Sequence, residues 1–312
     1  MILITGGCGY IGSHVERALQ EHRYEFVGFD NLSTGNIANN VGPCIVGDIT
    51  KKKDIEQVFE DYDIDCVFHL AAKTSVPESM ENPDLYYETN FEGTVNLLDV
   101  MKKHNCNKLV FSSTASVYEQ SRRAVTEDSP LQPLNHYAKA KLCAEQAILE
   151  QYDWLNAVIF RYFNVIGYNE NYDKSKEALK TNIVPKLLHC YNSGDTFKIF
   201  GNNYPVQREN PEDKTCVRDY IDVRDIAEAH LLAYNYMITH KGITKFNLGT
   251  KHGTSVLELL TAFEKANNVE IKKEFAPRRK GDPASIIANA QKANEILGWI
   301  PRYSLERSLE VL

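Results

Sequence analysis

Tyr137 and Lys141 are the residues whose types and spacing first suggest chemistry. They lie four positions apart in a segment with the pattern of a helix, so their side chains share one helix face. An ammonium group beside a phenol favours the phenolate and lowers the phenol pKa from its ordinary value of about 10. The hydroxyl of Thr114, which follows a predicted strand, could orient a reacting oxygen. We therefore predict a proton-transfer site, although this spacing also occurs by chance on ordinary helices.

A glycine-rich loop near the start of the chain supports this interpretation. Gly6, Gly9 and Gly12 follow a short apolar run and open an amphipathic segment. Glycines at this spacing let the backbone approach a pyrophosphate, and the free amides of the helix N-terminus face its phosphates. Asp30 ends the next predicted strand, eighteen residues after Gly12, where a carboxylate binds ribose hydroxyls and repels a 2′-phosphate. The sequence thus predicts NAD as cofactor in preference to NADP. Asp48 either reaches the adenine or is a turn carboxylate.

The first half of the chain has the pattern of a scaffold for these residues. Short β-branched runs alternate with amphipathic stretches, which is typical of a doubly wound parallel sheet covered by helices, the Rossmann type of α/β fold. The expected strands are 2–5, 25–29, 44–46, 66–70, 108–112 and 157–160, and the expected helices are 11–21, 53–61, 84–104 and 136–151.

The second half has a less regular pattern and predicts a smaller α/β substrate-binding lobe. Its expected helices are 181–191, 226–239, 256–265 and 291–297, and its expected strands are 197–200, 220–223 and 245–248. We predict an NAD-binding domain over 1–163, to which 217–240 returns. Residues 164–312 are expected to form mainly the smaller lobe.

Composition excludes several classes of function. The 312 residues include 35 basic and 42 acidic side chains, a formal charge of -7, which gives no broad positive field for nucleic acid. No apolar run approaches the roughly 20 residues that cross a bilayer, and the first residues lack the basic region of a signal peptide. We expect a cytoplasmic protein with no membrane partner. The seven cysteines, without metal-ligand spacing, predict reduced packing thiols and no metal site.

Six further stretches, together with the glycine loop, resemble the extended short-chain dehydrogenase/reductases, and within them the UDP-glucose (UDP-galactose) 4-epimerases. The resemblance covers nearly the whole chain, in order. The stretches are Asp30-Asn31-Leu32-Ser33-Thr34-Gly35, His69-Leu70-Ala71-Ala72, Ser112-Ser113-Thr114-Ala115-Ser116-Val117-Tyr118, Tyr137-Ala138-Lys139-Ala140-Lys141, Arg161-Tyr162-Phe163-Asn164 and Val217-Arg218-Asp219-Tyr220-Ile221.

The resemblance implies an isomerase in which NAD stays bound. Tyr137 takes the proton of the sugar 4-hydroxyl while C4 gives a hydride to NAD, and the hydride returns to the opposite face of the sugar. The implied cofactor-binding residues are Gly6, Gly9, Tyr10, Ile11, Gly12, Asp30, Asn31, Asp48, Ile49, Leu70, Ala71, Ala72, Asn90, Tyr137, Lys141 and Tyr162. The implied substrate-binding residues are Thr114, Asn164, Asn182, Arg218, Arg279 and Asp282. A homodimer through helices 84–104 and 136–151 is also implied.

The chain departs from the family pattern at several positions. A lysine that family members often place at Thr74 is shifted here to Lys73, and Glu119 stands where a glycine usually follows Tyr118. The loop 205–215 is longer than is typical and carries five charged residues. Ile286 aligns with the position thought to gate bulky N-acetyl groups, and its size does not decide the substrate.

Other activities within the same fold remain alternatives. A nucleotide-sugar 4,6-dehydratase normally carries an Asp-Glu pair after the threonine, where this chain has Ala115 and Ser116, so it lacks the acid and base that eliminate water. A UDP-glucuronate epimerase or decarboxylase is open, and Asp30 disfavours an NADPH-dependent reductase. An alternative of another class is an NAD-binding sensor without catalysis, which has no use for the Thr114, Tyr137 and Lys141 set.

Overall fold

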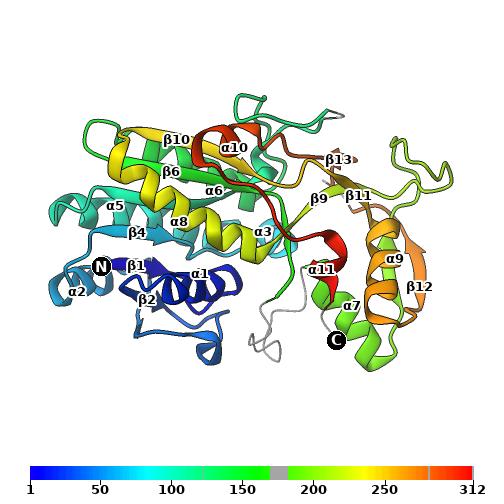
Figure 1. Cartoon of the computed structure of the whole chain (residues 1–312), viewed down its shortest axis with the longest axis horizontal. Coiled ribbons are helices and arrows are strands. Elements are labelled where there is room, and N and C mark those ends of the chain that lie inside the picture. The colour runs from blue at the N-terminus through cyan, green and yellow to red at the C-terminus, as the bar shows by residue number, and fades with distance from the viewer. Residues whose placement is uncertain (122, 169–181, 280–281, 311–312) are drawn as a thin grey trace.

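Buried strands form a seven-stranded parallel sheet that runs through the larger part of the molecule (Figure 1). The computed structural model describes residues 1–121, 123–168, 182–279 and 282–310. The sheet order is β10-β6-β5-β4-β1-β2-β3. The strands are β1 (Ile2–Thr5), β2 (Phe26–Asp30), β3 (Cys44–Val46), β4 (Cys66–His69), β5 (Lys108–Thr114), β6 (Asn156–Tyr162) and β10 (Ile243–Leu248). The predicted doubly wound fold is confirmed, and its order reverses between β1 and β4, where such sheets bind ligands.

Helices cover both faces of this sheet, and each side has its own apolar core. One core joins the sheet to α1 (Tyr10–Glu21), α8 (Val223–Thr239) and α10 (Gln291–Leu297). The other joins it to α2 (Lys52–Asp61), α5 (Gly93–Lys103) and α6 (His136–Leu149). Central strands such as β1 and β6 are buried along their whole length, because apolar residues face helices on both sides.

The helix predicted over 84–104 is interrupted. It consists of α4 (Pro83–Tyr87), a π-helical segment η2 (Glu88–Glu92) and α5, and a short helix α3 (Val76–Glu81) precedes it. Within η2 the buried Asn90 side chain bonds both backbone groups of Lys73, at 2.8 and 2.9 Å. The π-turn therefore places an inward amide where the carboxyl end of β4 leaves the sheet, as is common at functional sites.

The smaller lobe contains short strands and three helices at the right of Figure 1. A four-stranded sheet consists of β11 (Gly253–Ser255), β9 (Val217–Asp222), β13 (Ser285–Ile286) and β7 (Asn164–Ile166), and β8 (Phe197–Phe200) pairs with β12 (Lys273–Ala276). The helices are α7 (Ile183–Ser193), α9 (Val256–Asn267) and α11 (Leu305–Leu309). The helix predicted from 181 corresponds to α7, and residue 181 lies outside the described residues.

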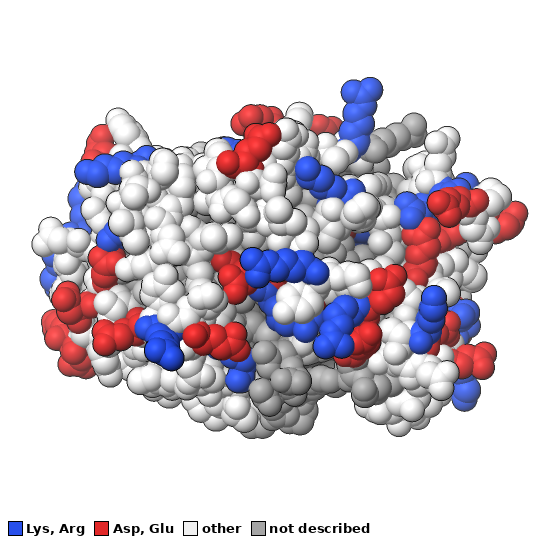
Figure 2. Space-filling view, in the orientation of Figure 1, with Lys and Arg blue, Asp and Glu red and all other residues white. Residues whose placement is uncertain are grey.

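Four short strands and two short helices were missed by the sequence analysis, namely β7, β11, β12, β13, α3 and α11. Strands of two to four residues carry too few side chains to show an alternating pattern. Acidic and basic side chains are interspersed on the face shown in Figure 2. Among the described residues, no helix has the length and apolarity that crossing a membrane requires.

Candidate active site

The turn from β1 into α1 can only be made with glycines at two of its positions. Gly6 has a φ of +76°, and a Cβ there would lie 2.7 Å from the amide nitrogen of Ala71. A Cβ on Gly12 would lie 2.1 Å from the carbonyl oxygen of Gly6. The first turn of α1 therefore packs against the loop itself, and the loop packs against the end of β4. This packing leaves a backbone cradle at the helix N-terminus, which suits a pyrophosphate.

Asp30 lies at the carboxyl end of β2, beside this cradle. Its carboxylate accepts hydrogen bonds from the amides of Cys8, at 3.1 Å, and Leu32, at 2.8 Å. Burial raises the pKa of Asp30, and the two amide donors oppose that rise. The two bonds fix the carboxylate in one orientation next to the glycine loop, as the predicted ribose-binding role requires.

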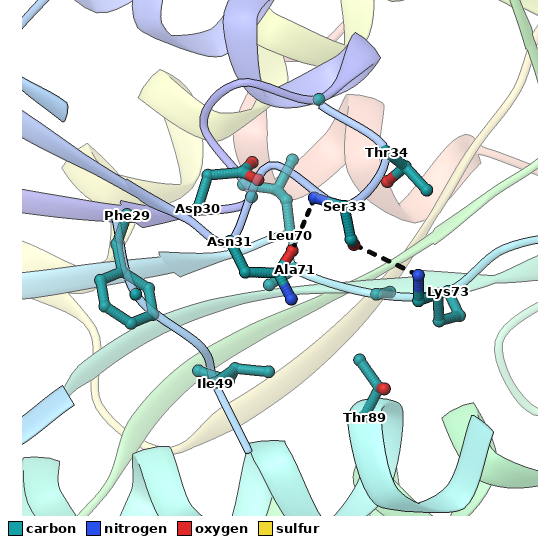
Figure 3. A pocket seen from close by; sticks show the side chains of 14 residues that line it. Phe29, Asp30, Asn31, Ser33, Thr34, Ile49, Leu70, Ala71, Lys73 and Thr89 are labelled. Carbon is teal, nitrogen blue, oxygen red and sulfur yellow. Dashed lines mark hydrogen bonds between the residues drawn. The ribbon is translucent and has the colours of Figure 1, made fainter. Parts of the chain in front are cut away.

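A cavity opens between the carboxyl ends of β1, β2 and β4 (Figure 3). Eight of the predicted cofactor residues line it, namely Gly6, Gly9, Asp30, Asn31, Ile49, Leu70, Ala71 and Ala72. Phe29, Ser33, Thr34, Gly47, Lys73 and Thr89 also line it and were not predicted as site residues. Lys73 donates to the Ser33 hydroxyl at 3.2 Å, so the displaced lysine reaches this cavity. The loop 31–34 follows Asp30 directly, and that adjacency was a signal that could have found Ser33 and Thr34.

Other predicted cofactor residues support the cavity from outside. Asp48 accepts from the Asn31 amide at 3.2 Å and from Thr50, and Asn90 fixes the backbone of Lys73. Tyr10 lines a second, small cavity that also includes Asn182. Ile11 packs against the core beneath α1.

Tyr137, in the first turn of α6, lies within hydrogen-bond reach of Thr114 at the carboxyl end of β5. The α6 N-terminus is fixed by Asn135, which accepts from the Ala138 amide at 2.8 Å. Burial raises the pKa of Tyr137, and the hydrogen bond with Thr114 lowers it by less. The spacing of Tyr137 and Lys141 predicted a lowered pKa for Tyr137, and that prediction is wrong for the protein without its cofactor. Burial of the ring disfavours the charged phenolate and so raises the pKa.

Lys141 follows Tyr137 by one helical turn and is 2% exposed. Its ammonium lies 4.7 Å from the centre of the Phe111 ring. Burial lowers the pKa of Lys141 to about 7, and the carboxylate of Glu145 opposes that change. Lys141 is therefore close to the point of losing its charge at neutral pH, which explains why it does little to acidify Tyr137 in the protein alone.

A buried ion pair lies one turn further along α6. Arg161 donates to both carboxylate oxygens of Glu145, at 3.0 and 2.6 Å, and each residue is 1% exposed. Ser113 donates a third hydrogen bond to Glu145, and Arg161 also donates to the Tyr118 hydroxyl at 3.0 Å. This network joins α6 to β5 and β6 beneath the Thr114–Tyr137 pair.

Tyr162 ends β6 at the same carboxyl edge of the sheet, and its ring packs in the core on the face covered by α1 and α8. Its hydroxyl lies 2.9 Å from Nε2 of His230, whose other ring nitrogen meets the carbonyl oxygen of Ile226 at 2.9 Å. Burial lowers the pKa of His230 to about 4, so its imidazole is neutral near pH 7. The neutral ring positions the Tyr162 hydroxyl through their hydrogen bond. Tyr162 is also close enough to Tyr137 for a negative charge on Tyr137 to raise the pKa of Tyr162.

Apart from Thr114 on β5, the predicted substrate residues lie on the smaller lobe. Arg218, Arg279 and Asp282 all lie close enough to Cys216 to influence its ionisation, so the fold brings these three together from β9 and from the segments before β13. Arg218 donates to the carbonyl oxygens of Val217 and Pro283, at 2.9 and 2.8 Å. The Arg279 guanidinium lies 3.8 Å from the centre of the Phe200 ring.

The two asparagines predicted to bind substrate, Asn164 and Asn182, are both exposed. Among the described residues, neither makes a hydrogen bond with Arg218, Arg279 or Asp282. Asn182 stands at the N-cap position of α7 beside the second cavity, without a capping hydrogen bond from its side chain, and Asn164 begins β7. The long loop 205–215 is tied to the N-terminus of α9, where Arg208 pairs with Glu258 at 3.0 Å. Ile286 is buried in a small cluster with Ala115.

The model of the NAD dependent epimerase/dehydratase family matches residues 2–249. A UDP-glucose 4-epimerase of Lactobacillus helveticus is 37% identical over 309 residues, which cover 97% of this chain and 92% of that relative. A bifunctional UDP-glucose 4-epimerase and UDP-xylose 4-epimerase of Pisum sativum is 35% identical over 329 residues, 98% of this chain and 92% of that one.

The fold is also similar to solved structures. The UDP-glucose-4-epimerase of Stenotrophomonas maltophila, with bound NAD and formylated UDP-arabinopyranose, is 32% identical with a TM-score of 0.93. The match covers 99% of this chain and 95% of that one.

Proposed function

Because the chain belongs to the NAD dependent epimerase/dehydratase family, we propose that it is an NAD-dependent isomerase that inverts C4 of a UDP-hexose. UDP-glucose and UDP-galactose, or their N-acetyl forms, are the proposed substrates. The observation that carries this proposal is the close approach of Tyr137 to Thr114, one helical turn from the buried Lys141. The similarity to UDP-sugar 4-epimerases, which extends over nearly the full length of both chains, supports it.

The residues that would hold NAD fit that cofactor. The cradle at Gly6 and Gly12, which a Cβ would fill, suits the pyrophosphate, and Asp30 is oriented beside it for the adenosine ribose. Lys73 and Ser33 meet at the edge of the same cavity, where they could reach the polar groups of NAD. When bound, NAD supplies a hydride acceptor and donor for C4 of the sugar.

The protein's own part in the reaction is to hold one proton at the sugar 4-oxygen. Tyr137 takes this proton as C4 is oxidised, and Thr114 orients the oxygen by its hydroxyl. The same phenol returns the proton after the sugar presents its other face, so the complete reaction neither consumes nor releases a proton. Lys141 favours the phenolate only in its charged form, so we propose that its ionisation near pH 7 sets the alkaline limit of activity.

The nucleotide sugar is proposed to lie between the two lobes. Arg218 and Arg279 would bind its diphosphate, because a guanidinium forms paired, charge-assisted hydrogen bonds with phosphate oxygens. Asp282, Asn164 and Asn182 would contact the nucleotide and sugar, as the family resemblance implies. We propose the domain division 1–163 with 217–240 for NAD and mainly 164–312 for the nucleotide sugar, and β10 adds a strand to the NAD-binding sheet.

A homodimer is part of the proposal. Leu142, Cys143 and Ala147 are apolar and partly exposed on α6, and they could pack against a second copy. Light scattering during gel filtration tests this, and a mass of one 35.5 kDa chain would contradict it.

Product analysis after incubation with UDP-glucose, UDP-galactose, their N-acetyl forms and UDP-glucuronate tests the activity. We expect the 4-epimer of unchanged mass, with no lasting rise in NADH absorbance. A product lighter by one water would instead identify a 4,6-dehydratase, and loss of carbon dioxide would identify a decarboxylase. No conversion of any of these sugars, with NAD bound, would favour the sensor alternative.

Tyr137→Phe tests the assignment of the proton carrier. We expect turnover to fall by about 10²–10⁴-fold, the usual contribution of a positioned acid–base group, while NAD stays bound. Tyr152→Phe is the matched control, because Tyr152 is 71% exposed and lies in the turn that follows α6. Turnover that survives in Tyr137→Phe would remove Tyr137 from this role.

A further inference from the structure

Two cysteines meet beneath the cofactor cavity. Cys8 belongs to the glycine loop and Cys44 begins the edge strand β3, and their sulfur atoms lie 3.4 Å apart. The residues are 36 positions apart in the chain, so the contact is made by the fold. A disulfide has a sulfur–sulfur length of about 2.05 Å, so a movement of roughly 1.4 Å would bring these sulfurs into a bond.

We propose that Cys8 and Cys44 are a redox modification site: low-molecular-weight disulfides such as oxidised glutathione convert the pair to a disulfide that weakens NAD binding. The proposal rests on the family's NAD cofactor and is independent of the sugar substrate. It also replaces the passive packing role that the sequence predicts for Cys8.

The two sulfurs have different parts in the exchange. Cys44 is partly exposed on an edge strand, so a small disulfide can reach it, whereas Cys8 is 1% exposed. Either sulfur can donate the hydrogen bond between them, and with the Cys8 thiol as donor the pKa of Cys44 falls and that of Cys8 rises. Cys44 is therefore the attacking thiolate, since the thiolate is the nucleophile in thiol–disulfide exchange.

The chemistry balances in two steps. The Cys44 thiolate attacks one sulfur of the oxidised glutathione, a mixed disulfide forms, and one glutathione leaves as a thiolate that takes a proton from water. The Cys8 sulfur then attacks Cys44 in the mixed disulfide, the second glutathione leaves, and it takes the proton that Cys8 loses. Two protein thiols are oxidised to one disulfide, and one glutathione disulfide is reduced to two thiols.

A buried carboxyl group beside the pair is a second, independent feature of this site. Glu16 is fully buried, and its Oε1 atom has no hydrogen-bond partner among the described residues. That oxygen would lie 2.2 Å from a Cβ on Gly7, the neighbour of Cys8, and 2.6 Å from a Cβ on Gly28, the strand partner of Cys44. Burial raises the pKa of Glu16 to about 8, so the group can exchange a proton near neutral pH while the thiols react.

The disulfide would act on the cofactor site through the backbone of Cys8. Its amide donates to Asp30 at 3.1 Å, and its carbonyl oxygen accepts from Asn36 at 2.9 Å. The glycine loop is tightly packed, because a Cβ on Gly12 would lie only 2.1 Å from the carbonyl oxygen of Gly6. A shift of Cys8 therefore moves its neighbours in the loop as well. Closing the sulfur gap therefore pulls on the loop and on the orientation of Asp30, both of which line the NAD cavity.

The test uses the purified protein with its NAD in glutathione buffers that range from fully reducing to strongly oxidising. Alkylation and peptide mapping should show a Cys8–Cys44 disulfide in the oxidising buffers, and the oxidised protein should bind NAD at least about fivefold more weakly. By the reciprocity of linked equilibria, excess NAD should shift disulfide formation toward more oxidising buffer by the same factor that the disulfide weakens binding.

Two variants serve as controls. Cys44→Ser should retain NAD equally in reducing and oxidising buffer, whereas Cys190→Ser, which removes a partly exposed thiol on α7, should behave as the wild type. The absence of a Cys8–Cys44 disulfide under strongly oxidising conditions overturns the proposal, and so does a disulfide that leaves NAD binding unchanged. If the reduced wild type holds no NAD, the proposed function itself fails, which is a distinguishable result.

Discussion

Replacing Lys141 by methionine should stabilise the protein at acidic pH while it abolishes turnover. Methionine matches the length of the lysine stem, so the substitution mainly removes the buried charge. Lys141 is 2% exposed, and burial lowers its pKa from 10.5 to about 7. At about 1.4 kcal/mol for each pH unit, this difference corresponds to roughly 5 kcal/mol of destabilisation by the protonated side chain.

The direction with pH follows from proton linkage. Between about pH 7 and 10.5 the unfolded chain binds a proton at Lys141 that the folded protein does not, so wild-type stability rises with pH over this window. The advantage of Lys141→Met should therefore be largest below pH 7, roughly 5 kcal/mol at pH 6, and should fall to roughly 2 kcal/mol at pH 9. The favourable contact with the Phe111 ring reduces the first figure somewhat.

Denaturant unfolding of both proteins at pH 6 and pH 9, with NAD removed, measures these differences. Lys139→Met is the matched control, because Lys139 is exposed on the same helix and its replacement should change stability by less than about 0.5 kcal/mol at either pH. If Lys141→Met is less stable than the wild type at pH 6, or its advantage is the same at both pH values, the interpretation of Lys141 as a costly buried charge is refuted.

Three further outcomes follow from the site. Gly12→Ala places a Cβ 2.1 Å from the carbonyl oxygen of Gly6, so we expect NAD affinity to fall roughly 5–150-fold for a cost of about 1–3 kcal/mol; titration calorimetry with an unchanged affinity would contradict the cradle. Arg161→Met leaves Glu145 without its cation in the core and should lower the unfolding free energy by about 3–5 kcal/mol, which a double replacement by Met and Leu should partly restore; equal stability of the two variants would argue against the pair. Asp30→Asn should shift the ratio of NADP to NAD affinity about tenfold toward NADP, and an unchanged ratio would show that Asp30 does not select the cofactor.

Local patterns were enough to predict the central scaffold. The strands β1, β3 and β8 and the helix α10 have the bounds that were expected, because each consists of a clear apolar run or an amphipathic segment between turn residues. The π-turn at Asn90 was missed, since it depends on a hydrogen bond between Asn90 and Lys73, seventeen residues apart. The placement of β10 beside β6 also depends on long-range packing that no local period reports.

The predicted site shows the same division. The glycine loop and Asp30 lie within the first thirty residues, and their spacing already indicates a dinucleotide cradle. Lys73, Ser33 and Thr89 line the same cavity, but they come from three different loops and helices that only the sheet order brings together.

The sequence by itself determined the Rossmann type of fold, the glycine cradle and the spacing of Tyr137 and Lys141, because each follows from short-range geometry along the chain. The tertiary structure alone decided the ionisation of these two side chains, since burial depends on residues that pack around them from other strands. It also decided the meeting of Cys8 with Cys44, because the pairing of β3 with β2 brings Cys44 beside the loop that follows β1.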